Sequence, residues 1–210
     1  TLPLPGIQPC IMDNDGNELN NLNVEGKLCI KFPWPSMART IYGDHKRFKD
    51  TYFSTFENMY FTGDGCIRDN EGMYRITGRV DDVIIVSGHN LGTAEIESAI
   101  DEHPNVCETA IVGYPHKIKG NAIYAFVITQ GDIKNEINTR AEINNLIVKN
   151  VGPIAKVEKI QFVKGLPKTR SGKIMRRILR KIASNDFSNF GDTSTLLDPN
   201  VVEEIIKEKI

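Results

Sequence analysis

A lysine at the end of a small-residue turn is the strongest chemical signal in this chain. Lys173 follows Ser171 and Gly172 within the segment 166–177, and glycine lets the backbone bend sharply there. Eight Lys or Arg and no acid lie between positions 164 and 181. A cation carried on such a turn suits delivery to an anionic site. For the segment alone, the alternative is a solvated basic helix.

A carboxylate and an arginine lie upstream of this segment. Asp64 stands between Gly63 and Gly65, which would let the backbone approach a ligand closely and leave the carboxylate accessible. Such a carboxylate can accept both hydrogen bonds of a ribose diol. Arg79 adds a cation two residues before Asp81. The structural alternatives are a turn aspartate and a surface ion pair.

The segment 86–92 is predicted to be a glycine loop between a strand and a helix, and contains Ser87, Gly88 and Asn90. It is similar to a phosphate cradle but lacks the spacing of either common phosphate-binding motif. As an isolated motif it is weak.

Composition limits the classes of protein to consider. The 210 residues carry a net charge of −1 and ordinary apolar and charged fractions, so nothing indicates nucleic acid or a membrane as a partner. The cysteines lack metal-binding spacing and are expected to be reduced thiols of a cytoplasmic protein. Their positions are Cys10, Cys29, Cys66 and Cys107. The chain starts at Thr1, and we expect it to be a piece of a longer protein.

The predicted fold class is α+β, with two parts. Residues 1–80 are expected to be mostly β, with Leu28, Ile30 and Phe32 on one face of a strand, a hairpin joining 65–68 to 74–77, and a loop with some helix at 36–56.

Residues 81–210 are expected to form a small second domain, with Asp81 at the junction. Its predicted strands are 83–86, 108–114, 122–129 and 157–163. Its predicted helices are 94–102, capped by Thr93, 140–150, a basic helix after Lys173, and 201–209.

Together, in this order, these motifs resemble the C-terminal part of the adenylate-forming, or acyl-CoA synthetase, superfamily. Within it, the resemblance is to the AMP-forming acetyl-CoA synthetases. It covers nearly the whole chain. The segments that carry it are 38–45, 51–56, 60–65, 78–82, 92–97 and 166–183.

The resemblance implies an acid–thiol ligase. Such enzymes use ATP with Mg²⁺ to convert acetate to an acetyl-adenylate, and coenzyme A then displaces AMP to give acetyl-CoA. Residues 1–80 would be the β-rich end of a large AMP-binding domain that continues upstream. Residues 81–210 would be a mobile C-terminal domain that rotates between the two steps. The phosphate loop and carboxylate pocket of the family lie upstream, so this chain is expected to be inactive alone.

The resemblance also implies residue roles. Lys173 would be the catalytic lysine of adenylation, and acetylation would remove the charge that it needs. Asp64, Arg79 and Asn90 would face ATP or AMP, and Asp81 would be the hinge. Ser87 and Gly88 would line the path of coenzyme A.

Five positions carry further expectations from the resemblance. The family usually has arginine at the positions of Asn90 and Val148, which predicts weaker contacts to the phosphates of AMP and of coenzyme A. The resemblance also implies a metal site near the end of the helix after the segment 86–92, where backbone oxygens would bind the ion. Its residues would be Asp101, His103 and Val106.

Two alternatives stay open on the sequence. The acid could be propionate or another short acid, because the pocket lies upstream. The segment 173–181 could instead be a non-catalytic polyanion-binding module, with a steep salt dependence. That alternative leaves Asp64, Arg79 and the junction unexplained.

Overall fold

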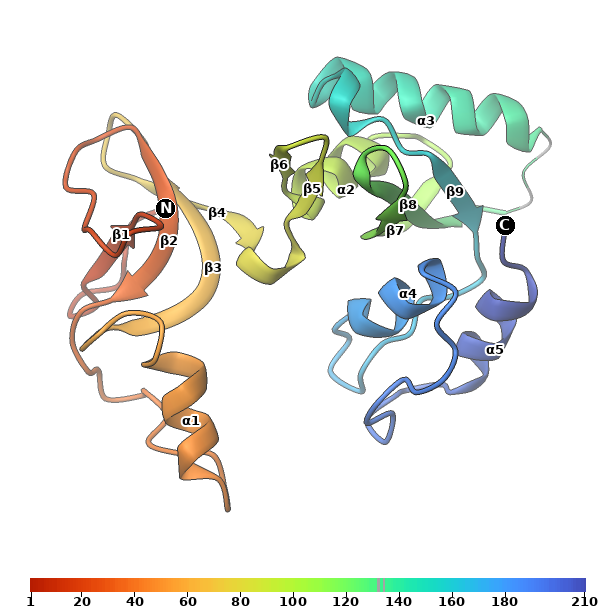
Figure 1. Cartoon of the computed structure of the whole chain (residues 1–210). Coiled ribbons are helices and arrows are strands. Elements are labelled where there is room, and N and C mark those ends of the chain that lie inside the picture. The colour runs from red at the N-terminus through yellow and green to blue at the C-terminus, as the bar shows by residue number, and fades with distance from the viewer. Residues whose placement is uncertain (132, 134) are drawn as a thin grey trace. The chain divides into compact units, whose positions relative to one another are not determined.

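The computed structural model describes residues 1–131, 133 and 135–210, and the chain divides into two compact units. Unit 1 is Thr1–Asp81 and unit 2 is Asp82–Ile210 (Figure 1). A 3₁₀ turn, Val80–Asp82, spans the division. The predicted fold class, α+β, is confirmed. Asp81 is the last residue of unit 1, and its action as a hinge stays a prediction.

Unit 1 is a four-stranded antiparallel sheet in the order β1-β2-β3-β4, with one helix. The elements are β1 (Pro9–Met12), β2 (Val24–Ile30), α1 (His45–Tyr52), β3 (Tyr60–Arg68) and β4 (Tyr74–Arg79). The hairpin predicted across 65–77 is confirmed as β3–β4. Asp69 at its turn accepts hydrogen bonds from the backbone of Glu71 and Met73, and Gly72 has a φ of 78°, as turn chemistry requires.

The predicted buried face of β2 is wrong. Cys29 faces the core and is fully buried, opposite Cys10 of β1, whereas Phe32 lies beyond the strand and is 57% exposed. The two-residue period is real, but the small apolar Cys29 takes the inner position that we assigned to its larger neighbours.

Unit 2 has a central sheet with helices on both faces (Figure 1). Its strands are β5 (Ile84–Val86), β6 (His89–Leu91), β7 (Val106–His116), β8 (Gly120–Thr129) and β9 (Lys159–Phe162). The order is β6-β5-β8-β7, and β9 pairs parallel to β8. The α-helices are α2 (Thr93–Asp101), α3 (Glu136–Asn150), α4 (Arg176–Ala183) and α5 (Asn200–Lys207), and Pro153–Ala155 forms a 3₁₀ turn.

Two apolar clusters cover the two faces of this sheet. Ile96 and Ile100 of α2 join Ile143 and Ile147 of α3 on one face. On the other face, the apolar side chains of α4 are completely buried with residues of α5. These α4 side chains are Ile178, Leu179 and Ile182. The sequence predicts Ile174 in the same stripe, but it lies before the helix and is only half-buried. The packing of α4 fixes the start of the helix and therefore the segment that carries Lys173.

Element boundaries differ from the predictions at two helices. Thr93 is the first residue of α2, not its cap, and it is buried. Helix α3 begins at Glu136, four positions before the predicted start, because Asn135 caps it by accepting a hydrogen bond from Asn138 N.

A buried tyrosine links the sheet to α5 and yields a prediction about alkaline pH. Tyr124 donates a 2.7 Å hydrogen bond to Gln161, whose amide donates to the carbonyl of Ile205. Burial raises the pKa of Tyr124 to about 12, against about 10 in the unfolded chain. The native state therefore holds this proton more tightly, and the contribution is lost as pH rises from about 10 through about 12.

Tyr124→Phe is expected to cost about 1 kcal/mol of unfolding free energy at neutral pH, because Gln161 loses its donor. Above pH 10 the native protein should lose stability more steeply than the variant, so the difference narrows. Urea unfolding of both proteins at pH 8, 10 and 11 checks this. A constant difference across that range would contradict it.

Within the described residues, no helix is both long and apolar enough to cross a membrane. All four cysteines are free thiols, and Cys107 is exposed.

Candidate functional site

Asp64 and Arg79 lie opposite each other on β3 and β4, as cross-strand partners. The Arg79 guanidinium lies 3.5 Å from Asp64 Oδ1 and 3.1 Å from Asp81 Oδ1, and it donates to the carbonyl of Thr62 at 3.0 Å. The structure thus brings three of the predicted site residues together. Among the described residues, the Asp64 carboxylate accepts no other side-chain hydrogen bond, so acceptor capacity remains for a ligand.

The glycines beside Asp64 make room for β4. Gly63 has a φ of 79°, and a Cβ added there would lie 2.5 Å from Arg79 Nη2. A Cβ on Gly65 would lie 2.6 Å from Thr77 Oγ1. The sequence predicts that a ligand approaches the backbone at these glycines closely. In this structure the side chains of Arg79 and Thr77 make that close approach.

The predicted glycine loop is instead a hairpin turn. Ser87 and Gly88 have φ of 49° and 85° and join β5 to β6, with Val86 opposite His89. Two successive residues at positive φ are the pattern of a two-residue hairpin turn. The prediction of a loop running directly from strand to helix is wrong, because β6 intervenes. Ser87 and Gly88 are exposed at the tip, and contact with coenzyme A stays a prediction.

Asn90 lies on β6, opposite Ile85, and is exposed. Val148 lies in a hollow of about 240 Å³ on α3, together with two cations, Arg140 and Lys156. These cations lie near the position for which the resemblance implies an arginine.

Lys173 lies at the exposed end of a closed turn. Thr169 N donates to Lys173 O at 2.9 Å, Gly172 N donates to Thr169 O at 2.9 Å, and Gly172 has a φ of 84°. The chain pairs again at Lys168 and Ile174. We name residues 167–175 the lysine turn. Among the described residues, the Lys173 amine has no hydrogen-bond or ion-pair partner, so its charge stays available.

Most other cations of this basic segment are already paired. The ion pairs join Lys168 to Glu108 (2.6 Å), Arg176 to Glu97 (2.8 Å), Arg180 to Asp82 (2.9 Å) and Lys181 to Asp186 (2.9 Å). Arg177 donates to the carbonyls of Phe190 and Asp192. A surface for a polyanion would need these charges unpaired, so the pairing disfavours that alternative.

The side chains at the predicted metal position are occupied. His103 is buried, with one ring nitrogen 3.1 Å from Glu142 Oε2 and the other accepting from Asn105 N. Its carbonyl accepts from Val106 N. Burial raises the pKa of Asp101. In the part of the chain that is described, no three His, Cys, Asp or Glu side chains converge on a possible ion. Binding by backbone oxygens is not tested by these side-chain contacts, so the metal site stays a prediction.

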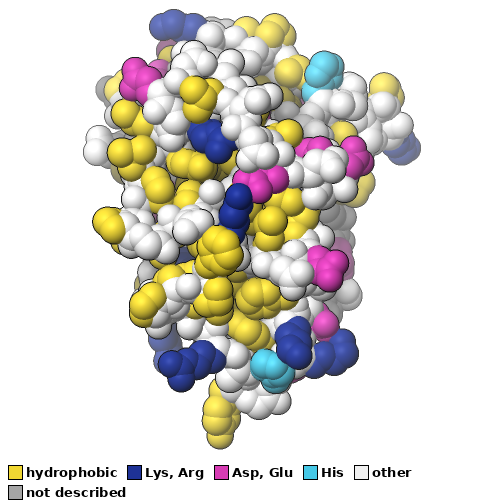
Figure 2. Space-filling model, turned by 90° about the vertical axis from the view of Figure 1, so that its left-hand side faces the viewer, with side chains coloured by type: hydrophobic (Ala, Val, Ile, Leu, Met, Phe, Trp, Pro, Cys, Tyr) yellow, Lys and Arg dark blue, Asp and Glu magenta, His cyan; other side chains and the backbone are white. Residues whose placement is uncertain are grey.

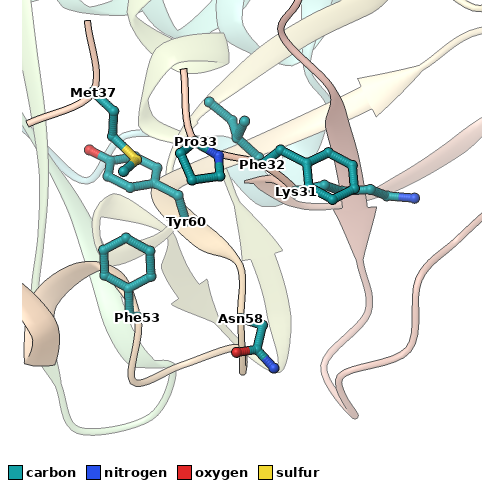
Figure 3. A pocket seen from close by; sticks show the side chains of 8 residues that line it. Lys31, Phe32, Pro33, Met37, Phe53, Asn58 and Tyr60 are labelled. Atoms are coloured by element: carbon teal, nitrogen blue, oxygen red, sulfur yellow. The ribbon is translucent and has the colours of Figure 1, made fainter. Parts of the chain in front are cut away.

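Unit 1 has a separate apolar hollow of about 250 Å³ (Figure 3). Phe53, Tyr60 and Met37 gather on one side of it, while the Lys31 amine points away and pairs with Glu18 at 2.6 Å. None of the predicted site residues lines it. Hydrophobic side chains also gather over the face shown in Figure 2. Large apolar residues of unit 1 that are more than half exposed are Leu2, Leu4, Leu22, Phe32, Tyr42 and Ile76.

The pair Glu97–Arg176 was missed by sequence reasoning. In the structure the Glu97 side chain is only 13% exposed. A signal was present, since Glu97 stands between Ile96 and Ile100 on the edge of the apolar stripe of the helix.

The sequence of this chain is similar to those of known enzymes. A family model described as the AMP-binding enzyme C-terminal domain matches residues 95–173. The acetyl-coenzyme A synthetase of Escherichia coli strain K12 is 57% identical over 209 residues. That of Methylorubrum populi is 56% identical over 209 residues. Each match covers 100% of this chain and 32% of the relative, so the chain spans about a third of their length.

Two solved structures are also similar to this chain. The anthranilate CoA ligase AuaEII, in complex with anthranoyl-AMP, matches with a TM-score of 0.76 and 26% identity, over 87% of this chain and 34% of that one. The ATP-bound MatB of Rhodopseudomonas palustris matches with a TM-score of 0.70 and 27% identity, over 85% and 34%. This chain therefore contains an AMP-binding enzyme C-terminal domain and corresponds to a C-terminal portion of an adenylate-forming enzyme, as its motifs predicted.

Proposed function

We propose that this chain is the C-terminal part of an AMP-forming acetate–CoA ligase. The observation that carries the proposal is the 56–57% identity to acetyl-coenzyme A synthetases along the entire chain. The exposed Lys173 and the Asp64–Arg79 pair support it. Acetate and ATP would give acetyl-adenylate and pyrophosphate, and the thiol of coenzyme A would then displace AMP.

Each predicted residue has a physical role in this scheme. Asp64 accepts hydrogen bonds from the ribose diol, and Arg79 holds that carboxylate in place. Lys173 offsets the negative charge that grows on the α-phosphate as the acetate oxygen attacks it. The amine stands on a turn without a competing carboxylate, which supports a role as a cation delivered to the phosphate.

The remaining cosubstrates follow from the same scheme. Mg²⁺ would arrive bound to the phosphates of ATP, since the described side chains form no cluster for it. Coenzyme A would pass the hairpin tip at Ser87 and Gly88. Asp81 would be the hinge about which unit 2 turns between the two steps. We also propose a cytoplasmic location, supported by the four free thiols.

A large upstream domain would complete the enzyme. Two observations support it: the chain covers 32% of its relatives, and unit 1 exposes large apolar side chains. The acetate pocket and the phosphate loop would lie in that domain, so the 210 residues alone should form no acetyl-CoA.

The test is product analysis with the longer protein that contains this chain. Incubation with acetate, ATP, Mg²⁺ and coenzyme A should give acetyl-CoA and AMP in equal amounts, with little activity on longer acids. Preference for propionate would move the proposal to another short acid. Salt-sensitive binding to heparin without any thioester would replace it with the polyanion-binding alternative.

A further inference from the structure

We propose that Glu97 is a positioning residue for Lys173, and that it acts through Arg176. The inference rests on the proposed function and names the side chains that hold the catalytic lysine in place. Glu97 would touch no substrate.

The lysine turn is closed by its own hydrogen bonds and also pairs with residues 195–197, where Arg170 N donates to Thr195 O at 3.1 Å and Leu197 N donates to Lys168 O at 2.8 Å. Contacts at its two ends then connect it to the sheet of unit 2. Met175 N donates to Pro167 O at 2.7 Å, and Lys173 N donates to Thr169 Oγ1 at 3.1 Å. These bonds shape the turn. They do not fix it to the sheet of unit 2.

Arg176 anchors the end that leaves the turn. It is the first residue of α4, three positions after Lys173. One guanidinium nitrogen, Nη2, lies 2.8 Å from both carboxylate oxygens of Glu97 on α2. The pair is largely buried, with 26% of the Arg176 side chain and 13% of the Glu97 side chain exposed. Low exposure strengthens the attraction and limits the motion of both side chains.

Glu97 is itself fixed to the sheet. Its Oε1 accepts a hydrogen bond from Ile111 N at 2.9 Å. Ile111 lies on β7, the strand at the end of the order β6-β5-β8-β7, and is fully buried. A buried N–H on an edge strand needs a partner, and Glu97 supplies it. The chain of contacts therefore runs from β7 through Glu97 to Arg176 and the lysine turn.

A contribution to folding stability does not by itself explain the Glu97–Arg176 ion pair. A cation at the first position of a helix opposes the helix dipole, and α4 has no acid in its first turn. Arg176 Nε is also buried without a hydrogen-bond partner among the described residues. Buried ion pairs add little net stability because desolvation offsets their attraction. A role in orienting the lysine turn would explain why the Glu97–Arg176 pair is present.

The other end of the turn has a separate anchor. Lys168 Nζ lies 2.6 Å from Glu108 Oε2 on β7. Both ends of the turn are thus tied to the α2–β7 region by partly buried ion pairs. The Glu97–Arg176 pair is the less exposed of the two, with side chains 13% and 26% exposed against 34% and 30% for Glu108 and Lys168, so we expect it to hold the turn more firmly.

The test uses the longer protein with Glu97→Gln, and Glu95→Gln as the matched control. Gln keeps an acceptor for Ile111 N but removes the charge that holds Arg176. Glu95 is an exposed glutamate of the same helix turn. Two half-reactions are measured: acetate-dependent ATP–pyrophosphate exchange, and acetyl transfer from synthetic acetyl-adenylate to coenzyme A.

We expect Glu97→Gln to lower kcat for exchange by about tenfold or more, because a displaced catalytic group loses its alignment. The KM for ATP and the rate of acetyl transfer should stay within twofold of native (about 0.4 kcal/mol). Arg176→Lys keeps the charge, but its amine ends one bond short of the Nη2 position, so it should show the same split. Glu95→Gln should match the native protein in both assays.

Equal loss in both half-reactions with a lower melting temperature would make Glu97 merely structural and overturn the inference. So would exchange in Glu97→Gln equal to that in Glu95→Gln. If Glu97→Gln does not fold, Arg176→Lys decides between the same outcomes. Absence of exchange in the native protein with any acid would instead reject the proposed function, and this inference with it.

Discussion

Replacing Lys173 with alanine is expected to lower the rate of acetyl-adenylate formation by about 10²–10³-fold. Removal of one donor to a developing oxyanion typically costs this much. The Lys173 amine has no partner among the described residues and stands directly after the Ser171-Gly172 bend, so its charge is available to the phosphate. Acetyl transfer from preformed adenylate to coenzyme A should be nearly unaffected, because it does not require this amine.

Lys164→Ala is the matched control. Lys164 is an exposed cation of the same basic segment and has no ion pair among the described residues. It should retain native exchange. If both variants lost exchange equally, the general charge of the segment would be responsible and the specific role of Lys173 would be wrong.

Gly63→Ala should damage the nucleotide site by displacing Arg79. The added methyl would lie 2.5–2.8 Å from the guanidinium, far inside contact distance, so Arg79 must leave Asp64. A shift of about 1 Å can cost on the order of 10²-fold, and we expect a loss of that size in kcat/KM for ATP. The positive φ adds about 1–2 kcal/mol of backbone strain. Steady-state kinetics and thermal unfolding measure the two effects.

Gly16→Ala separates strain from displacement. Gly16 has a similar φ of 87°, but an added Cβ there would meet no atom within 4 Å. Both variants should therefore lose similar stability, while only Gly63→Ala should lose affinity for ATP. Equal kinetic losses would mean that the packing of Arg79 against Gly63 is irrelevant to nucleotide binding.

Sequence reasoning succeeded where one periodicity governs a long element. The apolar residues of α4 recur at helical spacing, and the structure buries all of them. Strands β7 and β8 were predicted to within a few residues, because each has a long β-branched and aromatic run. The β3–β4 hairpin followed from its turn residues.

It failed where local signals were short or ambiguous. Strand β6 has three residues, too few to show a period, and its Ser87-Gly88 turn was therefore interpreted as a loop entering a helix. A positive φ is unusual for a residue with a Cβ such as Ser87, and no neighbouring residue in the sequence predicts this conformation. Thr93 has the residue type of a helix cap, but α2 begins at Thr93 itself, and the cap of α3 is Asn135.

The candidate site could be predicted in part from the sequence. Asp64, Arg79 and Lys173 stood out by their flanking residues, and the structure places the first two opposite each other. The Glu97–Arg176 pair joins positions 79 residues apart, and only the packing of α2, β7 and α4 brings them together. No local sequence pattern predicts an ion pair between residues so far apart in the chain.

The most direct test of the account is acetate-dependent exchange of labelled pyrophosphate into ATP, catalysed by the longer protein without coenzyme A. The account predicts rapid exchange with acetate, little with longer acids, and none with acetate omitted. No exchange with acetate or any other carboxylic acid, from a protein that is folded, would contradict the assignment of this chain to an acid-activating ligase.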